Sequence, residues 1–112
     1  MASTLGPVGI IGSGLAVPSR VITNDDLSQT VDTSDEWIFS RTGIRQRHRL
    51  DDGTDTSDLA AAAGARAIES AGISPDEIDT VICATITQDM SFPNTACMVQ
   101  AKLGLPKGAA FD

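Results

Sequence analysis

The chain has 112 residues, of which 41% are hydrophobic and 21% charged, a composition typical of one ordinary globular domain. Eight Lys and Arg against 15 Asp and Glu give a formal net charge of −7, which argues against a surface that binds nucleic acid or anionic lipid. Two cysteines and one histidine are too few for a zinc site, and no apolar run is long enough to cross a bilayer, so we expect a metal-free cytoplasmic protein with neither a nucleic-acid nor a membrane partner.

The N-terminal segment is rich in strand and turn signals. Residues 8–11 are a β-branched apolar run, and Gly12 and Gly14 follow, so we expect a buried strand that leads into a turn. Pro18 blocks the helix that a dinucleotide fingerprint would need, which favours a tight turn over a nucleotide site. Residues 24–27 are typical of a short helix start with acidic residues at the positive end of its dipole.

A capping-box pattern at Thr33 and Glu36 predicts that the next helix starts there, with the hydroxyl and the carboxylate each bonded to an orphan amide. This helix should run to about Thr42, with Gly43 as its left-handed cap. An extended segment over residues 44–50 would then place three arginines on one face: Arg45, Arg47 and Arg49. Any anion site in this acidic chain must therefore be local.

The second half of the chain alternates helices and strands. We expect helices over residues 57–71 and 93–103, a single turn with a capping box over residues 74–77, and buried strands over residues 81–86 and 108–112. The small side chains of the first helix permit close approach to a sheet, and the continuous apolar strand suits a position covered on both faces by helices. The alternation predicts an α/β fold with a mainly parallel sheet and helices on both faces.

Most reactive side chains have a simple structural interpretation. Cys83 lies within a predicted strand and Cys97 within a predicted helix, so both suit small core residues better than nucleophiles. His48 lies among arginines, which suits a solvated or structural residue better than a catalytic base. The sequence contains no P-loop motif.

Trp37 and Arg41 are the exception, because a spacing of four places both on one face of the predicted helix. An indole can stack on a purine while an arginine binds phosphate, and Thr33 supplies a hydroxyl at the same helix end. The alternative is that Trp37 packs inward while the arginines form a solvated face. The spacing alone leaves both interpretations open.

One family combines these features. Residues 31–38, VDTSDEWI, and residues 41–48, RTGIRQRH, closely resemble the N-terminal signature of β-ketoacyl-acyl-carrier-protein synthase III, the condensing enzyme that starts type II fatty acid synthesis. Further matching motifs are Gly12-Ser13-Gly14 with Pro18, Thr23-Asn24, Ala71-Gly72-Ile73, Ala84-Thr85, Phe92-Pro93 through Cys97, and Ala110-Phe111-Asp112. The resemblance thus extends over nearly the whole chain.

The resemblance implies a thiolase-like fold, a homodimer, and a decarboxylative Claisen condensation of an acyl-CoA primer with malonyl-acyl-carrier protein. Coenzyme A thioester is then a substrate, and no cofactor is implied. Trp37 would stack on the adenine of coenzyme A, Arg41 would contact its phosphates, and Thr33 would hydrogen-bond nearby. Phe92 would reach across the dimer interface to line the neighbour's acyl pocket, unless it is a hydrophobic staple before the last helix.

In this family the nucleophilic cysteine lies just beyond the Ala-Phe-Asp strand, and the catalytic histidine and asparagine come later. We therefore expect no catalytic residue here, and expect residues 1–112 to form an incomplete N-terminal thiolase-like domain, part of the N-terminal half only, inactive and marginally stable by itself. Three alternatives stay open: a coenzyme A or nucleotide-binding module, a structural half-domain that needs a partner chain, and a polyketide starter-unit synthase. The choice of acyl primer stays open too.

Overall fold

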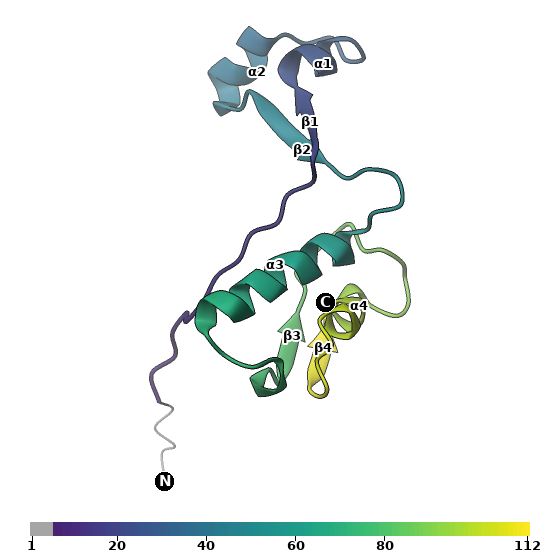
Figure 1. Cartoon of the computed structure of the whole chain (residues 1–112). Helices are drawn as coiled ribbons and strands as arrows, with labels where there is room; N and C mark the ends of the chain where they lie inside the picture. The colour runs from purple at the N-terminus through teal and green to yellow at the C-terminus, as the bar shows by residue number, and fades with distance from the viewer. Residues whose placement is uncertain (1–5) are drawn as a thin grey trace. The chain divides into compact units, whose positions relative to one another are not determined.

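The computed structural model describes residues 6–112, which belong to two compact units. We call residues 17–55 the hairpin unit, and residues 6–16 with 56–112 the helical unit. Each unit is described by itself (Figure 1). The prediction of one incomplete domain over residues 1–112 stays a prediction.

The hairpin unit is built from two short strands and two short helices. Its elements are β1 (Arg20–Thr23), α1 (Asn24–Ser28), α2 (Asp35–Thr42) and β2 (Gln46–Arg49). The two strands pair antiparallel, with Arg20 opposite Arg49 and Thr23 opposite Gln46. Strand β2 confirms the predicted extended segment, and β1 continues the extended run that Pro18 begins.

Both helices of this unit start at side-chain caps. Thr23 caps α1 in a capping box with Asp26, whose carboxylate accepts from the Thr23 hydroxyl at 2.7 Å and from the Thr23 amide at 2.8 Å. These bonds stabilise the ionised carboxylate and lower the pKa of Asp26. Helix α2 is capped by Ser34, whose hydroxyl accepts from the amide of Trp37 at 3.1 Å.

The predicted capping box at Thr33 and Glu36 is therefore wrong by one residue. Ser34 is the extended residue immediately before the helix, so its side chain, and not that of Thr33, faces the free amides of the first turn. The hydroxyl of Thr33 is buried without a hydrogen-bond partner among the described residues. The other end is as predicted, because α2 ends at Thr42 and Gly43 caps it with φ of 70°.

The helical unit contains α3 (Thr56–Ala71), the 3-10 turn η1 (Pro75–Glu77), β3 (Thr80–Ile82), α4 (Thr95–Lys102) and β4 (Ala109–Phe111). Strands β3 and β4 pair in parallel and lie side by side in Figure 1. The predicted long helix and the single turn with its capping box are confirmed. Helix α4 is shorter than predicted, because it starts after Asn94, whose side-chain oxygen accepts from the amide of Cys97 at 2.9 Å.

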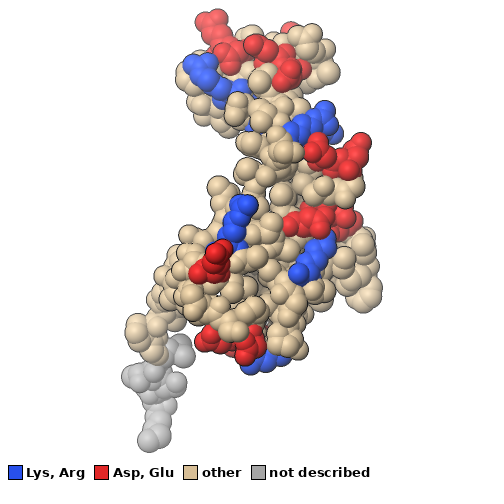
Figure 2. Space-filling view, viewed as in Figure 1, with Lys and Arg blue, Asp and Glu red and all other residues tan. Residues whose placement is uncertain are grey.

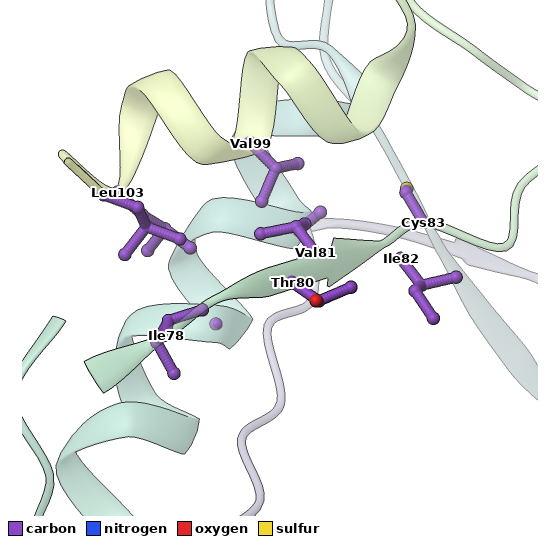
Figure 3. Close-up of a pocket in the computed structure, with 10 residues that line it drawn as sticks. Ile78, Thr80, Val81, Ile82, Cys83, Val99 and Leu103 are labelled. Atoms are coloured by element: carbon purple, nitrogen blue, oxygen red, sulfur yellow. The ribbon is translucent and has the colours of Figure 1, made fainter. Parts of the chain in front are cut away.

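Helix α4 supplies most of the core of this unit. Ala96 and Val99 are buried in it, and Leu105 packs back against it after Gly104 turns the chain, as predicted. Figure 3 shows Val99 directed toward Val81 of β3, whereas Ile82 points away and is 66% exposed. Among the described residues, the face of β3 that carries Ile82 is thus uncovered.

The first described residues do not form the strand predicted over residues 8–11. Val8 is 97% exposed and Ile10 is 93% exposed, and no described strand offers them a ladder partner. Gly12 and Gly14 instead run against α3, where an added Cβ on either would collide with the helix backbone. The small side chains of α3 therefore permit close approach of this segment, and an added Cβ on Gly64 would lie 3.0 Å from the side chain of Leu103, which follows α4.

Candidate functional site

The predicted pair on α2 is assembled as its spacing indicates. The guanidinium carbon of Arg41 lies 4.7 Å from the centre of the Trp37 ring, within range of a cation–π contact. Trp37 is 55% exposed, so the ring is not packed into a core. Helix α2 thus presents an aromatic surface with a cation stacked beside it.

These two side chains line a shallow hollow of ≈ 300 Å³, together with Ser34, Glu36 and Ser40. The hydroxyls of Ser34 and Ser40 are bonded to the backbone of Trp37, the first as the helix cap and the second as a donor to its carbonyl at 3.1 Å. Arg41 forms no ion pair with any residue from 6 to 112. An aromatic face next to an unpaired guanidinium suits a ligand with a flat ring and an anionic group.

Two neighbouring arginines are already engaged. Arg45 forms an ion pair with Asp35 at 3.2 Å and lies over the Phe39 ring, with its guanidinium carbon 3.7 Å from the ring centre. Arg47 donates to the side-chain oxygen of Asn24 at 2.6 Å. Figure 2 shows basic and acidic side chains interspersed on the visible face of the molecule. Of the three arginines predicted on one face, Arg45 and Arg47 are therefore held in contacts within the protein.

The other predicted site residues have different environments. Thr33 is close to the start of α2 in sequence, but it is not among the residues that line the hollow. Phe92, in the helical unit, is 88% exposed, so it does not pack as the hydrophobic staple considered above. Their proposed roles toward a ligand and a neighbouring subunit stay predictions.

Asn24 is the residue that the sequence analysis missed. We expected only a helix start at this position, yet its side chain is 1% exposed and bonds to residues 11, 20 and 23 positions away. Asparagine at a helix start is ordinary in a sequence, so only the folded contacts distinguish this one.

The reactive side chains considered above have structural environments. Burial, together with the negative charges of Asp112 and Asp89, raises the pKa of the Cys83 thiol and disfavours the nucleophilic thiolate. Cys97 directs its thiol toward the Ala110 carbonyl at 3.9 Å, and His48 Nδ1 donates to the Pro18 carbonyl at 2.6 Å. Within residues 6–112 there is no cluster of potential metal ligands and no helix long and apolar enough to cross a membrane.

An apolar cavity of ≈ 290 Å³ lies in the helical unit between β3 and the helices. Figure 3 shows Val81, Val99 and Leu103 around it, with Cys83 directly after β3. No charged side chain lines it, so this cavity offers no group for acid–base chemistry.

Comparison with known proteins defines the family to which this chain belongs. The model of the family "Thiolase, N-terminal domain" matches residues 38–112, and the chain therefore belongs to the thiolase family. Within this family, the relatives described next are condensing enzymes. The β-ketoacyl-[acyl-carrier-protein] synthase III of Xanthomonas axonopodis pv. citri is 58% identical over 95 residues, which is 85% of this chain and 29% of that protein. The crystal structure of the corresponding 3-oxoacyl synthase III from Aquifex aeolicus matches with a TM-score of 0.85 and 44% identity, covering 92% of this chain and 33% of that one.

Two other solved structures extend the comparison. The priming β-ketosynthase of the R1128 polyketide pathway matches with a TM-score of 0.85 and 32% identity, over 92% of this chain and 31% of that one. MvaS in complex with 3-hydroxy-3-methylglutaryl coenzyme A matches with a TM-score of 0.80 and 31% identity, over 93% of this chain and 25% of that one.

These matches confirm the thiolase-like α/β fold and the resemblance to synthase III. The strands described here form one parallel and one antiparallel pair, rather than the single mainly parallel sheet expected from the sequence. The chain spans about a third of the length of the curated relatives it matches.

Proposed function

We propose that the Trp37–Arg41 pair binds the coenzyme A moiety of an acyl-CoA substrate. The adenine stacks on the exposed face of Trp37, and the phosphates accept hydrogen bonds from Arg41, which has no ion pair among the described residues. The single observation that carries this proposal is the half-exposed indole with a stacked, unpaired guanidinium. A structural relative that was solved with a coenzyme A thioester supports the choice of ligand.

Thr33 has a smaller part in this proposal. Its hydroxyl is buried and has no hydrogen-bond partner within residues 6–112, and Thr33 directly precedes Ser34, the cap of α2. We propose that it donates to the bound coenzyme once the ligand is in place, since a buried hydroxyl gains from a partner.

For the protein as a whole, we propose the reaction of its synthase III relatives. An acyl group passes from coenzyme A to a cysteine, and the enolate released by decarboxylation of malonyl-acyl-carrier protein then attacks that thioester to form the new carbon–carbon bond. The identity of 53–58% to proteins of this name supports the assignment. We propose that Cys83 and Cys97 are not the nucleophile, that the protein acts as a cytoplasmic homodimer, and that Phe92 contributes to the partner's acyl pocket.

A polyketide starter-unit synthase is the second candidate, favoured by the match to a priming ketosynthase at the same TM-score as the fatty acid enzyme. We prefer fatty acid initiation because relatives at 53–58% identity are named synthase III, whereas the priming ketosynthase is 32% identical. Assaying the protein with carrier proteins from both kinds of pathway separates the two. Faster condensation with a polyketide carrier protein would favour the second candidate.

Binding of coenzyme A can be measured through Trp37, the one tryptophan of the chain. Titration with coenzyme A should change the emission of Trp37, and Arg41→Ala should raise the Kd about tenfold by removing a charged hydrogen-bond donor. Arg49→Ala is the matched control, because Arg49 is an exposed arginine of the same unit that does not line the hollow. No change of emission at millimolar coenzyme A would contradict the proposal.

A further inference from the structure

We propose that Asn24 is a positioning residue that holds both ends of helix α2 and so sets the orientation of Trp37 and Arg41. The inference rests on the function proposed above, because it concerns the same ligand site. Three observations support the inference: the hydrogen bonds of Asn24, the absence of a fully buried apolar residue on α2, and the ion pair and hydrogen bonds of the neighbouring arginines.

Both donor hydrogens of the Asn24 side chain are engaged, and its oxygen accepts one hydrogen bond. Its amide nitrogen donates to Asp35 Oδ1 at 2.8 Å and to the Ile44 carbonyl at 2.7 Å, and its oxygen accepts from Arg47 at 2.6 Å. Its backbone amide donates to the Arg45 carbonyl at 3.0 Å. A buried amide with three hydrogen bonds favours one geometry, because displacement of a partner leaves a buried polar group unpaired.

The partners of Asn24 lie at the two ends of α2. Asp35 is the first residue of the helix, and Ile44 directly follows its cap, Gly43. The two bonds from one nitrogen therefore hold the start and the end of the helix against the same point of α1. A rotation of α2 about its axis would break at least one of them.

Apolar packing does not supply an alternative anchor. No residue of α2 is buried, and Phe39 is 39% exposed and Trp37 55% exposed. Non-directional burial would in any case leave the helix free to rotate, whereas hydrogen bonds fix direction. The orientation of the Trp37–Arg41 face thus depends on the polar contacts.

The charged side chains around Asn24 also help to fix the orientation of α2. Asp35 accepts from Asn24 with one oxygen and pairs with Arg45 through the other, at 3.2 Å. Arg47 is held by Asn24 and by the Ile22 carbonyl at 3.3 Å. Two arginines are thereby kept in the protein's own contacts, while Arg41 has no ion pair among the described residues and stays available for an anion.

The test uses Trp37 as a reporter in the 112-residue chain. Asn24→Ala should lower the emission anisotropy of Trp37, because the indole gains motion when α2 is released, and should raise the Kd for coenzyme A about tenfold. The matched control is Asn94→Ala, which removes the α4 cap and a bond to the Ala110 carbonyl in the helical unit. It should leave both readouts of Trp37 unchanged.

A rescue variant separates positioning from general loss of stability. Asn24→Asp alone keeps the acceptor for Arg47 but places a carboxylate against Asp35, so it should resemble Asn24→Ala. Combining it with Asp35→Asn restores a hydrogen bond between positions 24 and 35, but leaves the Ile44 carbonyl without its donor and Arg45 without its carboxylate. The double variant should therefore recover part of the anisotropy and affinity that Asn24→Asp alone loses. Comparing the single and the double variant tests whether Asn24 positions α2 even if Asn24→Ala does not fold.

Two results would overturn the inference: unchanged anisotropy and affinity in folded Asn24→Ala, or equal losses in Asn94→Ala. Failure of the double variant to recover either readout would count against it as well. If the unmodified chain does not bind coenzyme A, the proposed function fails, while the anisotropy of the same variants still decides whether Asn24 positions the pair.

Discussion

In the hairpin unit the one buried residue is Asn24, a polar side chain, whereas the helical unit buries Ala96, Val99 and Leu105 around α4. The first unit is therefore ordered by directional bonds and the second largely by apolar packing. Directional bonds resist rotation, which suits the role proposed above for this unit, the presentation of a ring and a cation at a set angle. Apolar packing tolerates small shifts but resists loss of volume.

The largest change in the free energy of unfolding should come from a substitution in the apolar core of the helical unit. Leu105→Ala removes a buried side chain that packs on α4 and should lower the free energy of unfolding by about 2–4 kcal/mol. Ile82→Ala, at a residue 66% exposed, should change it by less than about 0.5 kcal/mol. Urea titration followed by circular dichroism measures both. Equal losses would show that α4 is not the centre of the packing.

A smaller change in stability should distinguish Ser34 from Thr33 as the cap of α2. Ser34→Ala removes the acceptor for the Trp37 amide and should destabilise the hairpin unit by about 1 kcal/mol. Thr33→Val replaces an unpartnered buried hydroxyl with a methyl group of similar size, and should be neutral or slightly stabilising in the absence of ligand. Trp37 emission during urea titration reports on this unit. A larger loss in Thr33→Val would restore the capping box predicted from the sequence.

The smallest expected effect is on how the stability of the helical unit depends on pH. Burial, Asp112 and Asp89 raise the pKa of Cys83 above its ordinary value of 9.0, so the folded chain favours the neutral thiol. Its contribution to stability is fully present below pH 9.0 and is lost as pH rises through the folded-state pKa. The urea midpoint should therefore fall less between pH 8 and pH 11 in Cys83→Ala than in the unmodified chain. An identical fall in both would contradict the raised pKa.

Local sequence patterns predict helix ends correctly where the residues of a single turn determine the cap. The glycine caps at Gly43 and Gly104 and the capping box of η1 are where the sequence places them. The cap of α2 was misplaced by one residue, because Thr33 and Ser34 are both good caps and only the chain's path selects one. The strand expected over residues 8–11 failed for a different reason, since a strand needs a partner and its apolar pattern does not name one.

By itself, the sequence determined the family signature, the helices and the spacing of Trp37 and Arg41, since these depend on local order along the chain. Tertiary structure alone decided that Arg45 and Arg47 are bound to the protein while Arg41 has no ion pair among the described residues. It also decided the role of Asn24, because its side-chain partners lie 11, 20 and 23 residues away. Contacts at that separation are set by how the elements pack, and no local pattern encodes them.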